Sequence, residues 1–326
     1  MLRVGILGAA GIAPASVIRP AARRSDVVIA AVASRDASGA TAYATKHGIS
    51  RSYGDYRALL GDPEIDLVYV ALPPSHHADW SIAALEAGKD VLCEKPFAMN
   101  ASQARRMRQV ADATGRRLIE AFHDRYHPLS AHLDELKASG RLGDIVSLHA
   151  DFSATIPFDP QSIRHEPVVG GGALMDLGCY PVHWIRAFMN EEPTVTSATA
   201  TLNALGADMS MVATMTLDGG ATATVSASME PDPDFICSFE VIGTKGTVQV
   251  HNLVFPSRGH YIREAIDGIT RERTVQGAET YDHQLAAIVD GLSTGRPLLT
   301  EGVDSVANME VIDSIYEAAG FTRDFA

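Results

Sequence analysis

Lys95 is a cation that follows a short apolar run, in the segment Val-Leu-Cys-Glu-Lys-Pro at residues 91–96. In a doubly wound α/β fold, ligands bind in the crevice at the carboxyl ends of the strands, so a cation at a strand end points at a ligand. The letters Glu-Lys-Pro alone carry little information. Their position after a glycine-rich turn, of the kind that receives a dinucleotide phosphate, makes Lys95 a candidate active-site residue.

That glycine-rich turn follows an apolar run and reads Gly-Ala-Ala-Gly-Ile-Ala at residues 8–13. Compared with G-x-G-x-x-G/A, Gly8 allows the tight turn from strand to helix. Ala10 stands at the second position, which must be small because the backbone approaches a pyrophosphate at the helix N-terminus. A small-residue turn needed only for packing is the alternative. The predicted cofactor contacts from this turn are Gly8, Ala10, Gly11, Ile12 and Ala13.

The turn after the second apolar run bears on the choice between NAD and NADP. A carboxylate there holds the ribose hydroxyls of NAD, whereas an arginine accommodates the 2′-phosphate of NADP. Ser34 and Arg35 suit a phosphate, and Asp36 is expected to cap the following helix. We therefore predict NADP, with NAD possible if Asp36 holds a ribose; a solvated Arg35 is the structural alternative.

A rigid loop, Ala-Leu-Pro-Pro-Ser-His-His at residues 71–77, follows a further apolar run. It too is expected at the carboxyl edge of the sheet, where its prolines would wall the ribose beside the nicotinamide. One of its two histidines is expected to cap or orient the loop. Adjacent histidines with no carboxylate at ligand spacing make a poor metal site, so no metal is predicted. The predicted cofactor contacts from these strand ends are Leu72, Pro73, His77, Glu94 and Lys95.

Residues 170–184 begin with three glycines and continue as an apolar, helix-compatible stretch. On an α-helix Asp176, Tyr180 and His183 fall on one face, and polar groups of this kind are costly to bury without partners. Pro181 should disturb the helix locally. Two interpretations stay open: the polar stripe faces a cleft, or it forms a hydrogen-bonded structural network.

The 326-residue chain has a net charge of −13, with 46% hydrophobic and 21% charged residues. This length predicts two domains, and the composition is that of a globular protein with a large core. An acidic surface argues against nucleic acid or an anionic membrane as a main partner. The three cysteines are too few and too widely spaced for a disulfide framework or a zinc site. We expect a cytoplasmic protein with reduced thiols, because no signal-peptide pattern or long apolar run stands out.

The elements that must position these residues change in character along the chain. The first third alternates apolar runs with helix-like segments, which indicates a parallel sheet covered on both faces. The apolar runs are residues 3–7, 27–33, 66–71, 90–93 and 118–122.

The second part has strands joined by tight turns, which predicts an antiparallel sheet. The two predicted hairpins pair 209–217 with 221–229 and 239–242 with 247–250, and helices are predicted near 128–139, 281–294 and 303–319. We therefore predict an α/β domain over residues 1–123 and an α+β domain over 124–326, whose C-terminal helices are free to pack back on the first domain.

These features together resemble the Gfo/Idh/MocA oxidoreductase family over essentially the whole chain. The resemblance rests on the glycine turn, residues 73–77, Glu-Lys-Pro at 94–96, Arg-Tyr-His-Pro at 125–128, residues 170–183 and Gly-Thr-Lys-Gly at 243–246. It implies a Rossmann domain with a mainly parallel sheet, followed by an α+β domain with a large open, mainly antiparallel sheet that often serves oligomerisation. It also implies hydride transfer between nicotinamide and a sugar-like hydroxyl or carbonyl.

One branch of the family carries Asp-x-x-x-His on the catalytic helix. Here Asp176 matches, but Tyr180 stands at the histidine position. That departure resembles the branch with dihydrodiol dehydrogenase, NADP-dependent D-xylose dehydrogenase and glucose–fructose oxidoreductase. By this resemblance Tyr180 is the proton donor or acceptor, Lys95 is its neighbour, and Asp176 orients the substrate or Lys95. Which of Lys95 and Tyr180 transfers the proton stays open.

The resemblance implies a carbohydrate or diol substrate and a homodimer or homotetramer formed through the C-terminal sheet. The leading interpretation is an NADP-dependent oxidoreductase acting on a sugar, polyol or cyclic diol. A nucleotide-sugar ketoreductase and a non-catalytic dinucleotide-binding sensor are the alternatives, and retention of both Lys95 and Tyr180 speaks against the sensor. His123, Arg125 and Arg164 are further cleft candidates outside the catalytic set.

Overall fold

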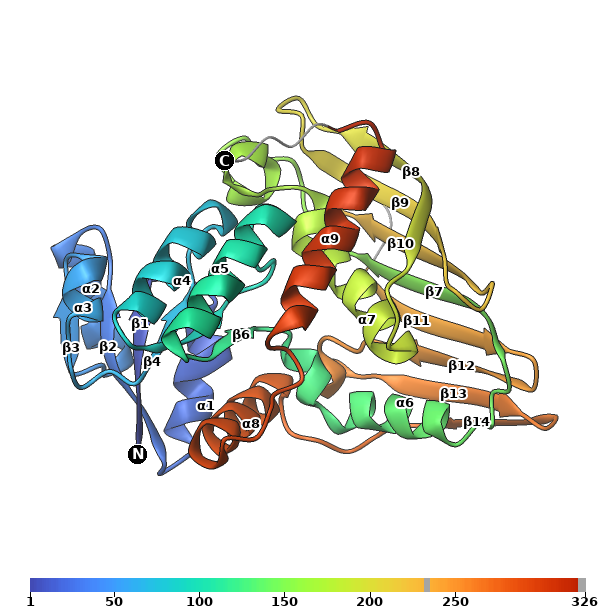
Figure 1. The fold of residues 1–326 in the computed structure, drawn as a ribbon, viewed down its shortest axis with the longest axis horizontal. Helices are drawn as coiled ribbons and strands as arrows, with labels where there is room; N and C mark the ends of the chain where they lie inside the picture. The colour runs from blue at the N-terminus through green and yellow to red at the C-terminus, as the bar shows by residue number, and fades with distance from the viewer. Residues whose placement is uncertain (232–234, 322–326) are drawn as a thin grey trace. The chain divides into compact units, whose positions relative to one another are not determined.

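The computed structural model describes residues 1–231 and 235–321. It divides into two compact units, which are described separately (Figure 1). The first unit comprises Met1–His123 and Tyr281–Val306, and the second comprises Asp124–Thr280 and the chain from Ala307. The first unit thus ends at His123 and then takes up a segment from much later in the chain.

Parallel strands form the sheet of the first unit, in the order β3-β2-β1-β4-β5-β6. The strands are β1 Leu2–Leu7, β2 Val27–Ala33, β3 Arg51–Tyr53, β4 Leu67–Val70, β5 Asp90–Cys93 and β6 Leu118–Glu120. Near-continuous apolar strands suit a sheet that is buried on both faces. The predicted parallel sheet is confirmed, while β3 has no apolar run and is not visible in the sequence pattern.

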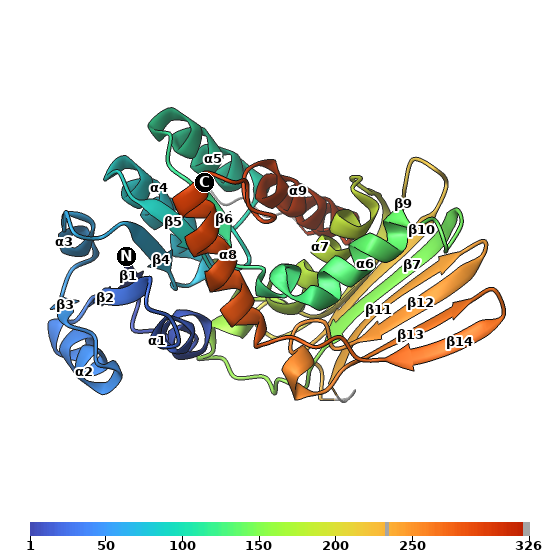
Figure 2. The same cartoon turned by 90° about the horizontal axis from the view of Figure 1, so that it is seen from below.

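The helices of the first unit cover this sheet. They are α1 Arg19–Ala22, α2 Ala37–His47, α3 Tyr56–Leu60, α4 His77–Glu86, α5 Ala101–Thr114 and α8 Thr280–Thr294. A π-helical turn, Pro14–Ile18, precedes α1. Helix α8 lies beside α1 in Figures 1 and 2, where Arg23 donates a hydrogen bond to Asp282. Leu285 and Ile288 of α8 pack in the same core cluster as residues of β1 and β2.

A mixed, mainly antiparallel sheet forms the scaffold of the second unit, in the order β14-β13-β12-β11-β7-β10-β9-β8. Its strands are β7 Ile145–Ser153, β8 Thr194–Leu202, β9 Asp208–Thr216, β10 Thr222–Ser228, β11 Ile236–Gly243, β12 Gly246–His251, β13 Tyr261–Ile266 and β14 Ile269–Arg273. Strands β7 and β10 run parallel, whereas the hairpins β9–β10 and β11–β12 are antiparallel, as predicted.

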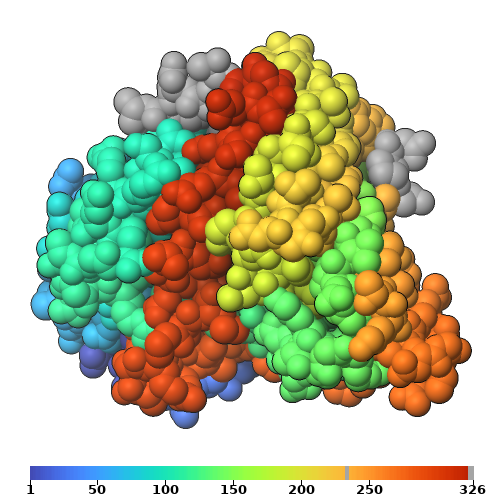
Figure 3. Space-filling view, turned by 45° about the vertical axis from the view of Figure 1, so that its right-hand side comes forward, coloured from blue at the N-terminus to red at the C-terminus, as the bar shows by residue number. Residues whose placement is uncertain are grey.

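Helices α6 Pro128–Ala138 and α7 Cys179–Met189 cover one face of this sheet. Helix α9, Val303–Ala318, enters the second unit at Ala307. Helix α6 lies beside β13 and β14 in Figures 1 and 3, where Glu264 accepts hydrogen bonds from His132 and Arg273.

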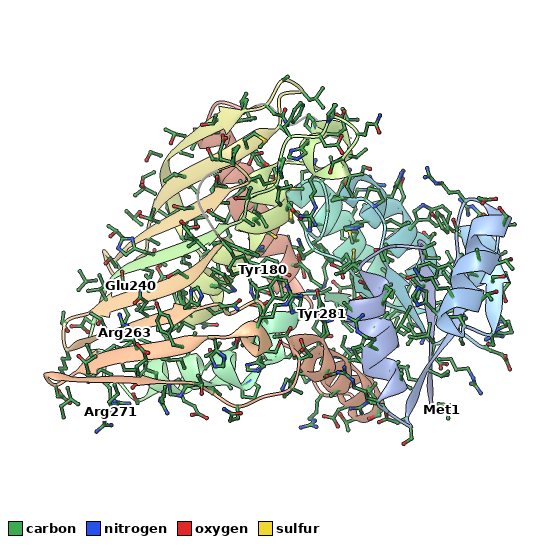
Figure 4. The ribbon with its side chains drawn as sticks, turned by 180° about the vertical axis from the view of Figure 1, so that it is seen from behind. Met1, Tyr180, Glu240, Arg263, Arg271 and Tyr281 are labelled. Atoms are coloured by element: carbon green, nitrogen blue, oxygen red, sulfur yellow. The ribbon has the colours of Figure 1, made fainter. Side chains whose placement is uncertain are left out.

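The opposite face of the sheet carries no helix of the described chain (Figure 2), and we call it the open face. Because side chains alternate along a strand, Phe239 packs on Trp184 and Phe188 of α7 while Glu240 projects from the open face. Glu240 and Arg263, labelled in Figure 4, belong to strands β11 and β13 of this face. Over residues 1–231 and 235–321, no helix is long and apolar enough to span a bilayer.

Candidate functional site

The carboxyl ends of neighbouring strands in the first unit are held in step by main-chain hydrogen bonds that continue one residue past each strand. The N–H groups of Gly8, Ala71, Glu94 and Ala121 donate to carbonyls of Ala33, Leu7, Val70 and Cys93, at 2.9, 3.0, 3.1 and 2.9 Å. The strand order reverses between β1 and β4, and the crevice outside such a point is where ligands bind in open α/β sheets. The sheet thus brings Gly8 and Glu94 to one edge.

The turn after β1 has the geometry expected of a phosphate-binding turn. Gly8 has a φ of 103°, and a Cβ there would lie 2.6 Å from the carbonyl oxygen of Ala71, so only glycine fits. At Gly11, by contrast, a Cβ would meet no atom within 4 Å, so the turn is open at this position. Ala13 is buried, and Ile12 is exposed. A pyrophosphate can therefore approach the backbone at Gly11.

The end of β2 separates the roles of Arg35 and Asp36. The Asp36 carboxylate caps α2, accepting hydrogen bonds from Ser38 N and Gly39 N at 3.2 and 2.8 Å. The Ser38 hydroxyl also donates to it, and this bond is the largest cause of the lowered pKa of Asp36. The predicted cap is confirmed, so this carboxylate is engaged, while Arg35 is exposed at the strand end. An exposed guanidinium next to an engaged carboxylate fits a 2′-phosphate better than a free ribose diol.

His77 ties the 71–77 loop to the Glu94–Pro96 segment. Its Nδ1 lies 2.9 Å from Pro96 O, and its Nε2 lies 2.7 Å from Leu72 O. The ring is 1% exposed, and burial lowers the pKa of His77 to about 4, so the ring is neutral and its single N–H donates to one of these two carbonyls. His77 therefore orients the 71–77 loop, as expected for one of the two histidines, and its predicted contact with the cofactor stays a prediction.

A buried chain of hydroxyl groups, which the sequence motifs do not reveal, holds Glu94. Ser16 Oγ donates to Tyr69 Oη at 2.7 Å, and Tyr69 Oη donates to Glu94 Oε1. Burial is the largest cause of the strongly raised pKa of Tyr69, so its phenol keeps its proton and acts as a donor. The only hint of this chain in the sequence is Tyr69 itself, a phenol inside the otherwise apolar strand β4.

Lys95 follows Glu94 at the end of β5, and its peptide bond to Pro96 is cis. In the first unit it acts on the buried His123, whose ring contacts that of Tyr281 at a centroid distance of 3.9 Å with a tilt of 35°. Burial and then the positive charge of Lys95 lower the pKa of His123 to about 3. The positive charge of Lys95 therefore acts on the His123 ring. Tyr281 comes from α8 and could not be assigned to the site from sequence.

The polar stripe of the second unit is not carried by one α-helix. Asp176 lies on a π-helical turn, Leu174–Gly178, and α7 begins only at Cys179. A π-helical turn changes the spacing per turn, so Asp176 and Tyr180 are not related by the regular α-helical spacing that the sequence predicts. Pro181 lies in α7 directly after the π-helical turn, so the helix departs from regular α-helical geometry next to this proline, as the sequence predicts.

The three stripe residues divide between the two interpretations left open. Tyr180 is 3% exposed, and its ring packs edge-on to Phe152 of β7 at 5.6 Å. His183 is buried next to Asp124, whose carboxylate accepts a hydrogen bond from Trp184 at 2.7 Å. His183 thus belongs to a structural network. Asp176, in contrast, is partly exposed and forms an ion pair with Arg164 at 2.6 Å.

The remaining cleft candidate, Arg125, pairs with Asp134 of α6 at 2.8 Å. Within the described residues no group of three or more His, Cys, Asp or Glu side chains is arranged to hold a metal ion. The site residues therefore fall into a first-unit set around Gly8, Glu94 and Lys95 and a second-unit set of Asp176 and Tyr180.

Two successive segments of this chain match known protein families. Residues 2–122 match the family described as "Oxidoreductase family, NAD-binding Rossmann fold", and residues 130–249 match the GFO/IDH/MocA C-terminal domain. The chain belongs to the Gfo/Idh/MocA oxidoreductase family. The expected family, the fold class and the enzyme class of oxidoreductase are therefore confirmed.

Named relatives of this Gfo/Idh/MocA protein act on sugars and diols. It is 37% identical to D-xylose 1-dehydrogenase (NADP(+)) 2 of Haloferax volcanii, over 97% of this chain and 96% of that protein. It is 34% identical to trans-1,2-dihydrobenzene-1,2-diol dehydrogenase of Xenopus tropicalis, over 69% and 67% of the two chains. The aldose-aldose oxidoreductase of Caulobacter crescentus, solved with glycerol, has a TM-score of 0.89 and 26% identity over 98% of this chain and 97% of its own.

Proposed function

We propose that this protein is an NADP-dependent dehydrogenase or reductase acting on a hydroxyl or carbonyl group of a sugar, polyol or cyclic diol. The observation that carries the proposal is the position of Lys95 directly after β5, at the carboxyl edge of the Rossmann sheet to which Gly8 and Glu94 also belong. A full-length relative named an NADP-dependent D-xylose dehydrogenase supports the same substrate class.

The first unit provides the residues that would hold NADP. The open turn at Gly11 would receive the pyrophosphate, and Ser34 with Arg35 would receive the 2′-phosphate, since Asp36 is engaged as a cap. Glu94, held by Tyr69, would accept hydrogen bonds from ribose hydroxyls. When bound, NADP supplies the nicotinamide that exchanges hydride with the substrate carbon. The further predicted contacts are Ala10, Ile12, Ala13, Leu72 and Pro73.

Tyr180 and Lys95 would handle the proton. Oxidation of a secondary alcohol requires a base for the hydroxyl proton, and a free tyrosine, with a pKa of about 10, is a weak base near neutral pH. The positive charge of Lys95 would favour the phenolate form and would stabilise a developing alkoxide. Asp176 would orient the substrate. In the reductive direction the same phenol would return the proton.

The test is a panel at 340 nm with NADP and NAD against aldoses, polyols, cyclic diols and ketosugars. We expect turnover with NADP and at least one aldose or diol. Turnover confined to ketosugars linked to nucleotides would favour the ketoreductase alternative. Tight NADP binding by isothermal titration with no turnover on any substrate would overturn the proposal in favour of a dinucleotide sensor.

We also propose that the open face joins copies of the chain as a homodimer or homotetramer. The face is uncovered in the described chain and carries both signs of charge, with Glu240 on β11 and Arg263 on β13. Val212 of β9 is 44% exposed on the same face, since its neighbours Met211 and Ala213 are buried. Sedimentation velocity of Val212→Asp is expected to show dissociation to monomers. An unchanged sedimentation coefficient would contradict this interface.

For location we propose the cytoplasm. Cys93, Cys179 and Cys237 are buried, and no disulfide joins them in the described residues, as expected of a protein kept in a reducing compartment. Expression of a tagged chain followed by cell fractionation tests this proposal.

A further inference from the structure

Arg164 stands on a short 3₁₀ turn, Ile163–His165, which the chain holds from both sides. Its carbonyl oxygen accepts a hydrogen bond from Gly172 N at 2.9 Å. A Cβ on Gly171 would lie 2.8 Å from the carbonyl carbon of Arg164, so the glycine run lets this segment pack directly on it. The next residue, His165, is buried, and its carbonyl accepts from Asn203 at 3.0 Å. Arg164 therefore projects from a fixed backbone.

The side chain of Arg164 closes a ring of three hydrogen bonds. Gly172 N donates to Arg164 O, Asp176 N donates to Gly172 O at 2.9 Å, and Arg164 Nη1 donates to Asp176 Oδ2 at 2.6 Å. A charge-assisted bond of this kind is about twice as strong as a neutral one. Both the main chain and the carboxylate of Asp176 are thus set by contacts with the Arg164 segment. The three-glycine run therefore positions Asp176 against the Arg164 segment, a role unrelated to phosphate binding.

The charge of the pair limits what it can recognise. The Arg164 side chain is 48% exposed and that of Asp176 is 16% exposed, so the guanidinium presents further N–H donors to solvent beside a carboxylate acceptor. Because the two charges cancel, the pair offers little net attraction to a phosphate or carboxylate substrate. The N–H donors of Arg164 beside the Asp176 carboxylate match two neighbouring hydroxyl groups of a substrate. One hydroxyl would donate a hydrogen bond to Asp176, and the other would accept one from Arg164.

We infer that Arg164 is a positioning and specificity-determining residue, which holds Asp176 in place and selects uncharged substrates with a second hydroxyl next to the reacting one. This inference rests on the proposed function, since it assigns the substrate class to the same site. It adds that the enzyme distinguishes a vicinal diol from an isolated alcohol through the Arg164–Asp176 pair.

The experiment measures kcat and KM with NADP for two matched substrate pairs. They are trans-cyclohexane-1,2-diol against the 1,4-diol, and D-glucose against 2-deoxy-D-glucose. Within each pair the substrates differ in whether a hydroxyl stands next to the reacting carbon. We expect the wild type to prefer the vicinal member, and Arg164→Gln to lower kcat/KM for that member about 10- to 100-fold while changing the other little.

Arg164→Lys separates positioning from recognition. Lysine keeps an ion pair with Asp176 but lacks the planar fork. We therefore expect kcat to return toward the wild-type value while KM for the vicinal substrate stays raised. Arg24→Gln is the matched control, because Arg24 forms an exposed pair with Asp26 at the opposite end of the first-unit strands. NADPH affinity and melting temperature, measured for each variant, check folding.

The outcomes distinguish this inference from the proposed function. A wild type with no turnover on any substrate overturns both. If the wild type is active and Arg164→Gln keeps its preference for the vicinal substrates, the inference alone is overturned. A preference lost in Arg164→Gln, with NADPH affinity intact, supports it.

Discussion

The two sheets of this protein position chemistry in different ways. In the first unit, Gly8 and Glu94 stand one residue past the ends of parallel strands, and the ladder that aligns the strands also aligns these residues. In the second unit the strands form a scaffold, and Asp176 and Tyr180 stand on a π-helical turn and helix packed against it. Strand order therefore determines the first set, whereas side-chain packing determines the second.

The largest effect on catalysis is expected from removing Lys95, the cation of the first unit. Lys95→Ala is expected to lower kcat by roughly 10²- to 10⁴-fold, the range for loss of an acid–base group, with NADPH binding nearly intact. Steady-state kinetics and fluorescence titration measure the two effects. The matched control is Lys46→Ala, at an exposed position of α2. A Lys95→Ala enzyme that turns over normally would remove the first unit from the proton chemistry.

Glycine substitutions test whether the strand-end turn is built for packing or for a ligand. Gly8→Ala forces a non-glycine residue to a φ of 103° against Ala71 O. The expected loss is about 1–3 kcal/mol in the free energy of unfolding, together with weaker NADPH binding. Gly11→Ala meets no protein atom and is expected to leave stability unchanged while raising the Kd for NADPH. Urea melts and titrations of both variants measure this. Unchanged NADPH binding in Gly11→Ala would support the packing alternative.

Cofactor preference tests the end of β2. Arg35→Gln is expected to raise KM for NADP about 10- to 100-fold, because a hydrogen bond to a charged group is lost, while KM for NAD changes little. The substitution Asp36→Ala tests the helix-capping role of Asp36 separately from phosphate binding by Arg35. It is expected to lower the free energy of unfolding by about 1 kcal/mol without a switch in cofactor preference. A switch produced by Asp36→Ala would mean that the carboxylate reads the ribose.

Acid stability is expected to differ between the units. The folded-state pKa values of His77 and His123 are about 4 and about 3, below the ordinary 6.5, so the unfolded chain takes up protons first as pH falls. The contribution of each neutral ring to the free energy of unfolding is therefore lost progressively as pH falls from about 6.5 toward the folded-state pKa of that ring. Burial raises the pKa of Asp124 in the second unit, so its contribution is lost as pH rises.

The two tryptophans report on this difference separately. Trp80 lies in α4 of the first unit and Trp184 in α7 of the second. Urea melts of Trp184→Phe and Trp80→Phe, followed by fluorescence at pH 7 and pH 5, are expected to show greater acid destabilisation through Trp80. Equal acid destabilisation through both reporters would contradict the assignment.

The sequence predicts the first unit better than the second for a physical reason. Apolar runs and glycine spacing identify β1, β2, β4 and β5, and residues at strand ends then follow from the parallel topology. The Tyr69–Glu94 hydrogen bond and the Tyr281–His123 ring contact join residues far apart in sequence, and local patterns cannot show them. In the second unit the hairpins follow from turn glycines, but the π-helical turn at Asp176 depends on tertiary packing that helical periodicity does not encode.

The most direct test of the account is the Tyr180→Phe enzyme. The substitution removes one hydroxyl and keeps the ring that packs on Phe152, so the fold should be preserved. We measure NADPH affinity by fluorescence and turnover at 340 nm on the best substrate of the wild type. The account predicts nearly unchanged affinity and a rate lower by roughly 10²- to 10⁴-fold. Near-normal turnover in Tyr180→Phe would contradict the assignment of the proton transfer to this residue.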